Sequence, residues 1–70
     1  MNMRTTRKEK KLTQEELAVK LGVDQTSVSK WEQKKSIPRI DTMYKLAEVL
    51  EVSVSEIMSY FYTKPKEIEV

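Results

Sequence analysis

Five polar residues between positions 25 and 33 have the types and the spacing to contact the edges of base pairs. If Val28 and Trp31 point inward on a helix, the five fall on its opposite face, at i, i+1, i+4, i+5 and i+8. A glutamine amide can pair with adenine N6 and N7, a lysine can donate to guanine, and a threonine methyl can contact a thymine methyl. A solvated helix surface has the same polarity and is the alternative. The candidate base-reading residues are Gln25, Thr26, Ser29, Lys30 and Gln33.

The segment that follows carries cations and a hydroxyl that could bind phosphate. Such groups contact the backbone of a nucleic acid and set the register of a protein without reading the bases. A solvated basic loop is again the alternative. Residues 1–35 hold nine Lys or Arg against five Asp or Glu, whereas residues 36–70 hold four against six; this bias suits a polyanion partner of the first half. The candidate phosphate-binding residues of the segment are Lys34, Lys35, Ser36 and Arg39.

The groups that most catalytic and metal sites need are missing from the sequence. The 70 residues include no His and no Cys, so thiolate nucleophiles and the usual zinc ligands are absent. Glu15 and Glu16 are neighbours on an expected helix, where their side chains point about 100° apart and cannot share a substrate. We therefore expect no enzyme activity, no cofactor and no metal site.

Length and composition predict one small domain. Seventy residues lie near the lower size at which a hydrophobic core holds a fold without disulfides or metals. The sequence contains no apolar run of the ~20 residues that span a bilayer, and its N-terminal segment lacks the apolar stretch of a signal peptide. The sequence thus predicts a cytoplasmic protein that does not enter a membrane.

Two helices that would position the polar face are marked by their capping residues. Thr13 and Glu16 have the spacing of a capping box, which predicts a helix over residues 14–21. Asp24 is a good N-cap type and predicts a second helix over about residues 25–33. Only three residues separate the two helices, so the chain needs a positive φ directly after the first one. Gly22 is the only glycine in the sequence, and it adopts that conformation at little cost.

The second half of the chain shows two more helical stripes. Apolar residues at 40, 43, 44, 47 and 50 predict an amphipathic helix over residues 40–50. Ser53 and Glu56 repeat the capping-box spacing before a helix that we expect to end near Phe61. Phe61 should extend the core stripe, while Tyr60 and Tyr62 should project elsewhere. These aromatics could form a dimer surface or cap the core of the monomer.

Both ends of the chain leave alternatives open. Asn2 could cap a helix that begins at residue 3, or Thr6 and Glu9 could form a capping box for a much shorter helix. Residues 67–70 alternate polar and apolar side chains, which fits either an edge strand or a loose tail. The expected organisation is one domain over residues 1–62, followed by a tail over residues 63–70.

The stretch QEELAVKLGVDQTSVSKWE, continued by QKKSIP and LAEVLEVSVSEI, resembles the Cro and phage-repressor (Xre-like) type of helix-turn-helix protein. The resemblance covers about residues 7–58. It implies an all-α fold, a compact five-helix repressor-like bundle in which the helix over residues 25–33 enters the DNA major groove. The residues that carry it most specifically are Gln14, Leu17, Ala18, Leu21, Gly22, Val23, Val28, Trp31 and Glu32.

The resemblance also implies roles for three residues of this chain. Gln14 should bind a phosphate oxygen from the start of its helix, and Arg7 should form a structural ion pair with Glu32. The resemblance also implies structural roles, without DNA contact, for Gly22, Ala18, Val28 and Trp31. The sequence departs from the family at three helix ends where glycine is frequent and this chain has Lys11, Lys34 and Glu51. Thr6 replaces a usual large apolar residue, so the first helix should be short or frayed.

Two functions follow as hypotheses. The first is a sequence-specific transcription regulator, most simply a repressor that binds a palindromic operator in double-stranded DNA as a homodimer. The second is an antitoxin-type protein that neutralises a protein partner through its C-terminal tail and also binds its own promoter.

Overall fold

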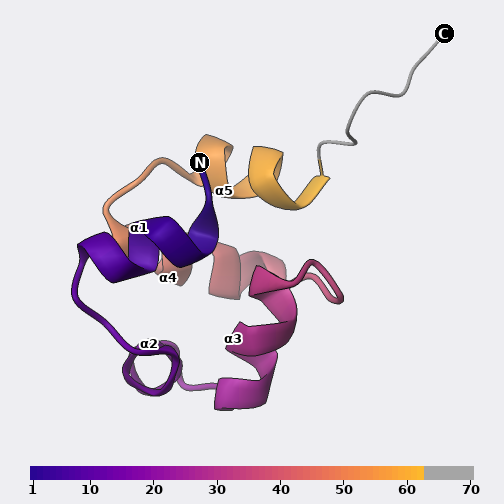
Figure 1. Ribbon diagram of the computed structural model, residues 1–70. Helices are drawn as coiled ribbons and strands as arrows, with labels where there is room; N and C mark the ends of the chain where they lie inside the picture. Colours follow the sequence, from indigo (N-terminus) through magenta and orange to yellow (C-terminus); the bar gives the residue numbers. More distant parts are fainter. Residues whose placement is uncertain (63–70) are drawn as a thin grey trace, which may run out of the picture.

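The structure, a computed structural model, describes residues 1–62, and these residues form five helices and no strand (Figure 1). The expected all-α, five-helix fold is confirmed. The possible edge strand and the proposed partner-binding tail, residues 63–70, lie outside the described residues. The helices are α1 (Met3–Glu9), α2 (Gln14–Leu21), α3 (Gln25–Glu32), α4 (Ile40–Leu50) and α5 (Val54–Tyr62).

Side-chain caps explain where the first two helices begin. The Thr5 amide donates to Asn2 Oδ1 at 3.0 Å, so α1 starts at residue 3 and the alternative start at Thr6 is wrong. At α2 the predicted capping box is complete, because the Glu16 amide donates to the Thr13 hydroxyl at 3.0 Å and the Thr13 amide donates to the Glu16 carboxylate at 2.9 Å. Asp24 does precede α3, but its side chain makes no capping hydrogen bond.

Four successive helices end in the same way. In each, a residue with positive φ follows the last turn, and the next amide donates to the carbonyl five residues earlier, as in a Schellman motif. At α2 the Val23 amide reaches the Ala18 carbonyl at 3.0 Å, and Gly22 has φ 73°. The other three ends place non-glycine residues in this left-handed conformation, with φ of 59–60°. These are Lys11, Lys34 and Glu51, the positions at which the sequence departs from the family.

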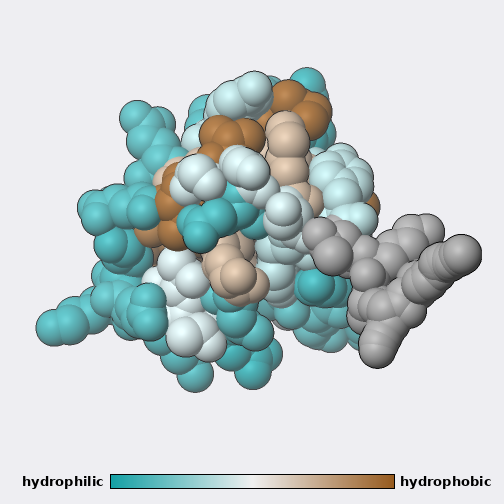
Figure 2. Space-filling view, turned by 90° about the horizontal axis from the view of Figure 1, so that it is seen from above, coloured by the Kyte–Doolittle hydropathy of each residue, from teal (hydrophilic) through white to brown (hydrophobic). Residues whose placement is uncertain are grey.

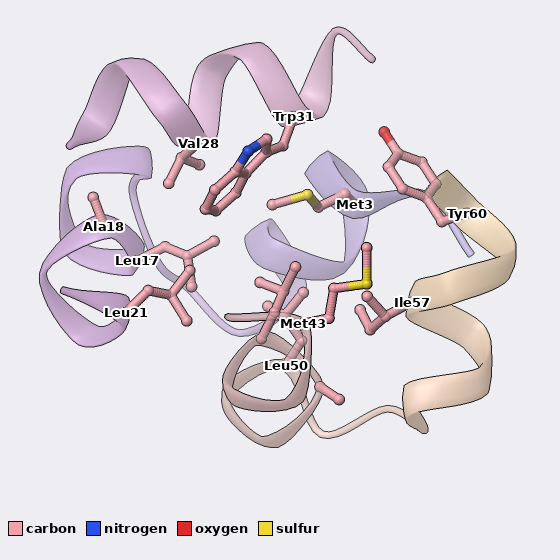
Figure 3. Packing of buried hydrophobic residues seen from close by; sticks show 12 residues of the cluster. Met3, Leu17, Ala18, Leu21, Val28, Trp31, Met43, Leu50, Ile57 and Tyr60 are labelled. Atoms are coloured by element: carbon pink, nitrogen blue, oxygen red, sulfur yellow. The ribbon is translucent and has the colours of Figure 1, made fainter. Parts of the chain in front are cut away.

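The core lies where all five helices meet (Figure 3). α2 packs against both α3 and α4, and α5 packs against α4. Although α1 has only seven residues, Met3 is fully buried and Arg7 nearly so. The short first helix is thus anchored by two residues of its inner face. The fully buried apolar side chains are Met3, Leu17, Val28, Met43, Leu46, Leu50 and Ile57.

Two predicted apolar stripes face partly away from the core. On α4, Ile40 and Tyr44 are more than half exposed, whereas Leu46, which the predicted stripe omitted, is fully buried. On α5, Phe61 is half-buried and packs against the core, as predicted, and Tyr62 is exposed. Tyr60, which was expected to project elsewhere, is buried instead. In both helices the apolar face is wider than the part that neighbouring helices cover. The packing of those neighbours therefore decides which apolar residues are buried.

Apolar side chains remain partly accessible over α5. α5 lies at the top of the molecule in Figure 1, and Figure 2 views the molecule from that side. This face shows hydrophobic patches interrupted by polar groups. Half-buried apolar residues of the second half of the chain are Val49, Val52, Val54, Met58 and Phe61. Across residues 1–62, no helix has the length and the apolar character needed to cross a membrane.

Candidate nucleic-acid interface

The α2–α3 corner presents one face of α3 to solvent. In Figure 1, α2 is viewed nearly along its axis while α3 runs across the view, so the two helices cross steeply. Ala18, Val28 and Trp31 are buried between α3 and the rest of the domain. The opposite face is therefore turned away from the core. All five candidate base-reading residues lie on it: Gln25, Thr26, Lys30 and Gln33 are exposed and Ser29 is half-buried.

The N-terminal ends of α2 and α3 together form an open hollow. It is lined by Gln14, Gln25, Thr26 and Ser29. Gln25 Nε2 donates to Gln14 Oε1 across the hollow at 3.4 Å, and Gln33 Nε2 donates to Ser29 Oγ at 2.9 Å. The structure thus joins Gln14, a candidate phosphate contact, to the candidate base-reading residues in one polar surface.

A buried carboxylate supports this surface from behind. The Glu32 side chain is 0% exposed and forms the expected ion pair with Arg7, whose Nε donates to Oε2 at 2.6 Å and whose Nη2 donates to Oε1 at 3.2 Å. Gln14 Nε2 also donates to Glu32 Oε1, at 3.0 Å. Arg7 Nη1 donates to the Leu12 carbonyl at 2.8 Å. A chain of hydrogen bonds therefore runs from Arg7 through Glu32 and Gln14 to Gln25.

The protonation of Glu32 follows from these partners. Burial by itself would raise the pKa of this carboxyl group. The hydrogen bonds from Arg7 and Gln14, together with the positive charge of Arg7, outweigh burial and hold the Glu32 pKa below its ordinary value. Glu32 is therefore ionised at neutral pH and orients Gln14 as a charged acceptor.

The loop after α3 places its candidate phosphate residues in different surroundings. Lys35 is exposed and Ser36 is half-buried. Arg39 is exposed, with its Nε 3.5 Å from Asp41 Oδ1. The ammonium of Lys34 instead lies 4.3 Å from the centre of the Tyr60 ring. Lys34 is exposed like Lys35 and Arg39, and its contact with an aromatic ring distinguishes it from them.

Two residues that the sequence did not associate with Glu32 also contact it. Arg4 Nε lies 3.5 Å from Glu32 Oε1, and the Tyr60 hydroxyl donates to the Glu32 carbonyl at 3.3 Å. Burial, and then the negative charge of Glu32, raise the pKa of the Tyr60 phenol, so it stays a protonated donor at neutral pH. Arg4 could have been found because it precedes Arg7 by one helical step, whereas no local signal points to Tyr60.

Comparison with known proteins agrees with this arrangement. A family model described as helix-turn-helix matches residues 3–57. The chain is 38% identical over 50 residues to the HTH-type transcriptional activator BcrR of Enterococcus faecalis, an alignment that covers 71% of this chain and 24% of that protein. The chain thus spans about a quarter of the length of this relative. No solved structure matches this chain significantly. Because the family model covers most of the chain and includes the corner, the polar face and the Arg7–Glu32 pair, the chain belongs to the helix-turn-helix family of Xre/Cro-like proteins.

Proposed function

We propose that this protein is a sequence-specific DNA-binding regulator of transcription, whose α3 enters the major groove. The observation that carries the proposal is the face of α3 opposite Val28 and Trp31, which is polar and largely exposed to solvent. An α-helix fits the major groove, where each base pair offers a distinct pattern of donors and acceptors. The family and the named regulator among its relatives support the same function.

Gln25 has the free groups that bidentate contact with adenine requires. Its amide nitrogen carries two hydrogens, of which one is used toward Gln14. The second can donate to adenine N7 while Gln25 Oε1 accepts from N6. Gln14 likewise gives one amide hydrogen to Glu32, which leaves the other for a phosphate oxygen. One network would then set the position of both contacts before DNA arrives.

The remaining contacts divide between bases and phosphates. Lys30 can donate to guanine, and Thr26 and Ser29 can contact bases near the hollow. Lys35, Ser36 and Arg39 follow α3 directly and can bind the flanking backbone. Gln33, at the C-terminal end of the face, would lie at the edge of the contacted base pairs.

We further propose that the protein binds a palindromic site as a homodimer. One small reading head contacts few base pairs and is too weakly selective among the competing sites of a genome. Two copies related by a two-fold axis would place their α3 helices about 34 Å apart, one turn of DNA. An exposed apolar patch supports the dimer: Ile37, Ile40 and Tyr44 are 50%, 52% and 56% exposed.

Repression is the simplest outcome that we propose for such binding, because it requires only that the bound dimer occupies the promoter and no contact with another protein. A reporter gene controlled by the selected site should give less product when the protein is expressed. An increase in product would contradict repression and leave the DNA-binding proposal intact.

Selection from random duplex DNA tests the proposed function. We expect the purified protein to enrich one palindromic sequence whose half-sites are centred about 10 base pairs apart. Recovery of unrelated sequences at moderate ionic strength would contradict sequence-specific binding. Recovery of a single asymmetric half-site would contradict the dimer but not the reading face.

Lys30→Ala tests the reading face directly. We expect it to weaken binding to the selected site by about 1–3 kcal/mol and to relax the preference at one base pair, because a bidentate base contact is lost. Competition against single-base variants of the site measures both effects. Lys20→Ala, which removes a lysine of α2 that is also exposed, serves as the charge-matched control. An equal loss on scrambled DNA would show that Lys30 contacts only the backbone.

Tyr44→Asp tests the apolar patch. Because Tyr44 is 56% exposed, the substitution should leave the fold intact while a charge disfavours apolar association. We expect sedimentation to show a shift from dimer to monomer, with lower affinity for the palindrome and unchanged affinity for one half-site. Val19→Asp is the matched control, since Val19 is 75% exposed on α2. A Tyr44→Asp protein that remains a dimer would exclude this patch as the interface.

A further inference from the structure

One side chain of α5 contacts both the last residue of α3 and the loop that follows it. Tyr60 is 9% exposed; its hydroxyl donates to the Glu32 carbonyl at 3.3 Å, and its ring lies beneath the Lys34 ammonium at 4.3 Å. Phe61 packs edge-on against the same ring, with 4.9 Å between the ring centres. The Tyr60 ring is therefore held in place and offers Lys34 a fixed face.

The position of the ring turns Lys34 away from the reading face. Figure 3 shows Tyr60 on the side of α3 to which Val28 and Trp31 point, opposite the exposed polar face. The left-handed conformation of Lys34, φ 60°, is fixed by the helix ending in which the Lys35 amide donates to the Lys30 carbonyl at 2.8 Å. Because the face of an aromatic ring attracts cations, the Tyr60 ring favours the same orientation of the Lys34 ammonium as the backbone does.

The geometry points to a role for Tyr60 in the specificity of DNA binding: it is a positioning residue that holds Lys34 off the phosphates and leaves Lys35 as the phosphate-binding lysine of this loop. The inference rests on the proposed function. A lysine that binds phosphate strengthens binding to every sequence equally, because the backbone is the same in all of them. Withdrawing Lys34 lowers non-specific affinity and so increases the relative contribution of the base contacts made by α3.

Salt dependence distinguishes this role from a structural one. The slope of log K against log[salt] changes by about 0.9 for each phosphate contact. We expect Tyr60→Leu, which removes the ring, to steepen that slope by about 0.9 and to increase binding to scrambled duplex several-fold. Tyr60→Phe keeps the ring and loses only the hydroxyl, so its slope should match the unsubstituted protein although both variants lose thermal stability.

Lys34→Gln and Lys35→Gln complete the experiment. In the unsubstituted protein Lys34→Gln should leave the slope unchanged, whereas Lys35→Gln should reduce it by about 0.9. Combined with Tyr60→Leu, Lys34→Gln should abolish the steepening. If Tyr60→Leu fails to fold, the single variant Lys34→Gln still tests the inference. A salt slope reduced by about 0.9 in that variant would show that Lys34 binds a phosphate, and would overturn the inference.

Failure of the inference differs from failure of the proposed function. If the unsubstituted protein selects no duplex sequence, the proposed function is wrong. If it selects a sequence but Tyr60→Leu leaves the salt slope unchanged, the function stands and the role of Tyr60 is wrong.

Discussion

Glu32→Gln should lower the free energy of unfolding by about 3–5 kcal/mol, because it leaves the buried guanidinium of Arg7 without a negative partner. The Glu32 side chain is 0% exposed and that of Arg7 only 8% exposed, so water cannot replace the lost charge. Small domains are stable by only about 5–15 kcal/mol, so this loss is a large part of the total. Urea unfolding followed by circular dichroism measures it.

Glu51→Gln is the matched control for this prediction. Glu51 pairs with Lys10 at 2.7 Å, almost as closely as Glu32 pairs with Arg7, but the Glu51 side chain is 71% exposed. Surface ion pairs are screened by water, so we expect only a small fraction of the loss seen for Glu32→Gln. Equal losses for the two variants would show that burial of the Glu32 pair contributes nothing.

The Glu32 carboxylate should also make the free energy of unfolding depend on pH in the acid range. The folded pKa of Glu32 is lower than its unfolded value, so its contribution is fully present above the unfolded pKa and is lost as the pH falls through the folded pKa. Thermal midpoints measured across the acid range should therefore fall less steeply in Glu32→Gln than in the unsubstituted protein. Parallel curves would contradict the lowered pKa.

Gly22→Val should destabilise the domain by roughly 1–3 kcal/mol, because a β-branched residue is strained at positive φ. No atom outside Gly22 and its two chain neighbours lies within 4 Å of the position that a Cβ would take there, so the backbone conformation is the cause and crowding is not. The α2–α3 corner depends on this conformation, and DNA affinity should fall with the folded fraction. Thermal unfolding measures the effect.

Gly22→Asn separates backbone strain from the loss of glycine itself. Asparagine enters the left-handed region more readily than other non-glycine residues, so this variant should lose much less stability than Gly22→Val. Lys11, Lys34 and Glu51 already hold such conformations in this domain. Equal losses for the valine and asparagine variants would show that φ is not the controlling factor at Gly22.

Local sequence signals predicted the α2–α3 corner accurately. The Thr13–Glu16 capping box and the single glycine defined both ends of α2, and Gly22 has the positive φ that the short connection required. The spacing of Val28 and Trp31 defined which face of α3 is buried. These features depend on residues at most five positions apart, whose backbone hydrogen bonds and side-chain directions follow from the helix itself.

Contacts between distant segments were predicted less well. Helical periodicity predicted that Ile40 and Tyr44 face the core and that Tyr60 points away from it. All three predictions are wrong. An apolar stripe shows which side of a helix can be buried but not how much of it the neighbouring helices cover. The contact of Lys34 with Tyr60 likewise joins residues 26 positions apart, and no residue adjacent to either one signals it.

The amino-acid sequence by itself determined α2 to α5, with their ends to within about one residue, and the polar face of α3, because capping, φ preference and helical periodicity act between near neighbours. It left the start of α1 open. Only the tertiary structure decided that Gln14 also donates to Glu32, and that Tyr60 contacts Lys34. The reason is physical: burial, and the strength of a charge interaction within it, depend on which separate helices exclude water from the same place.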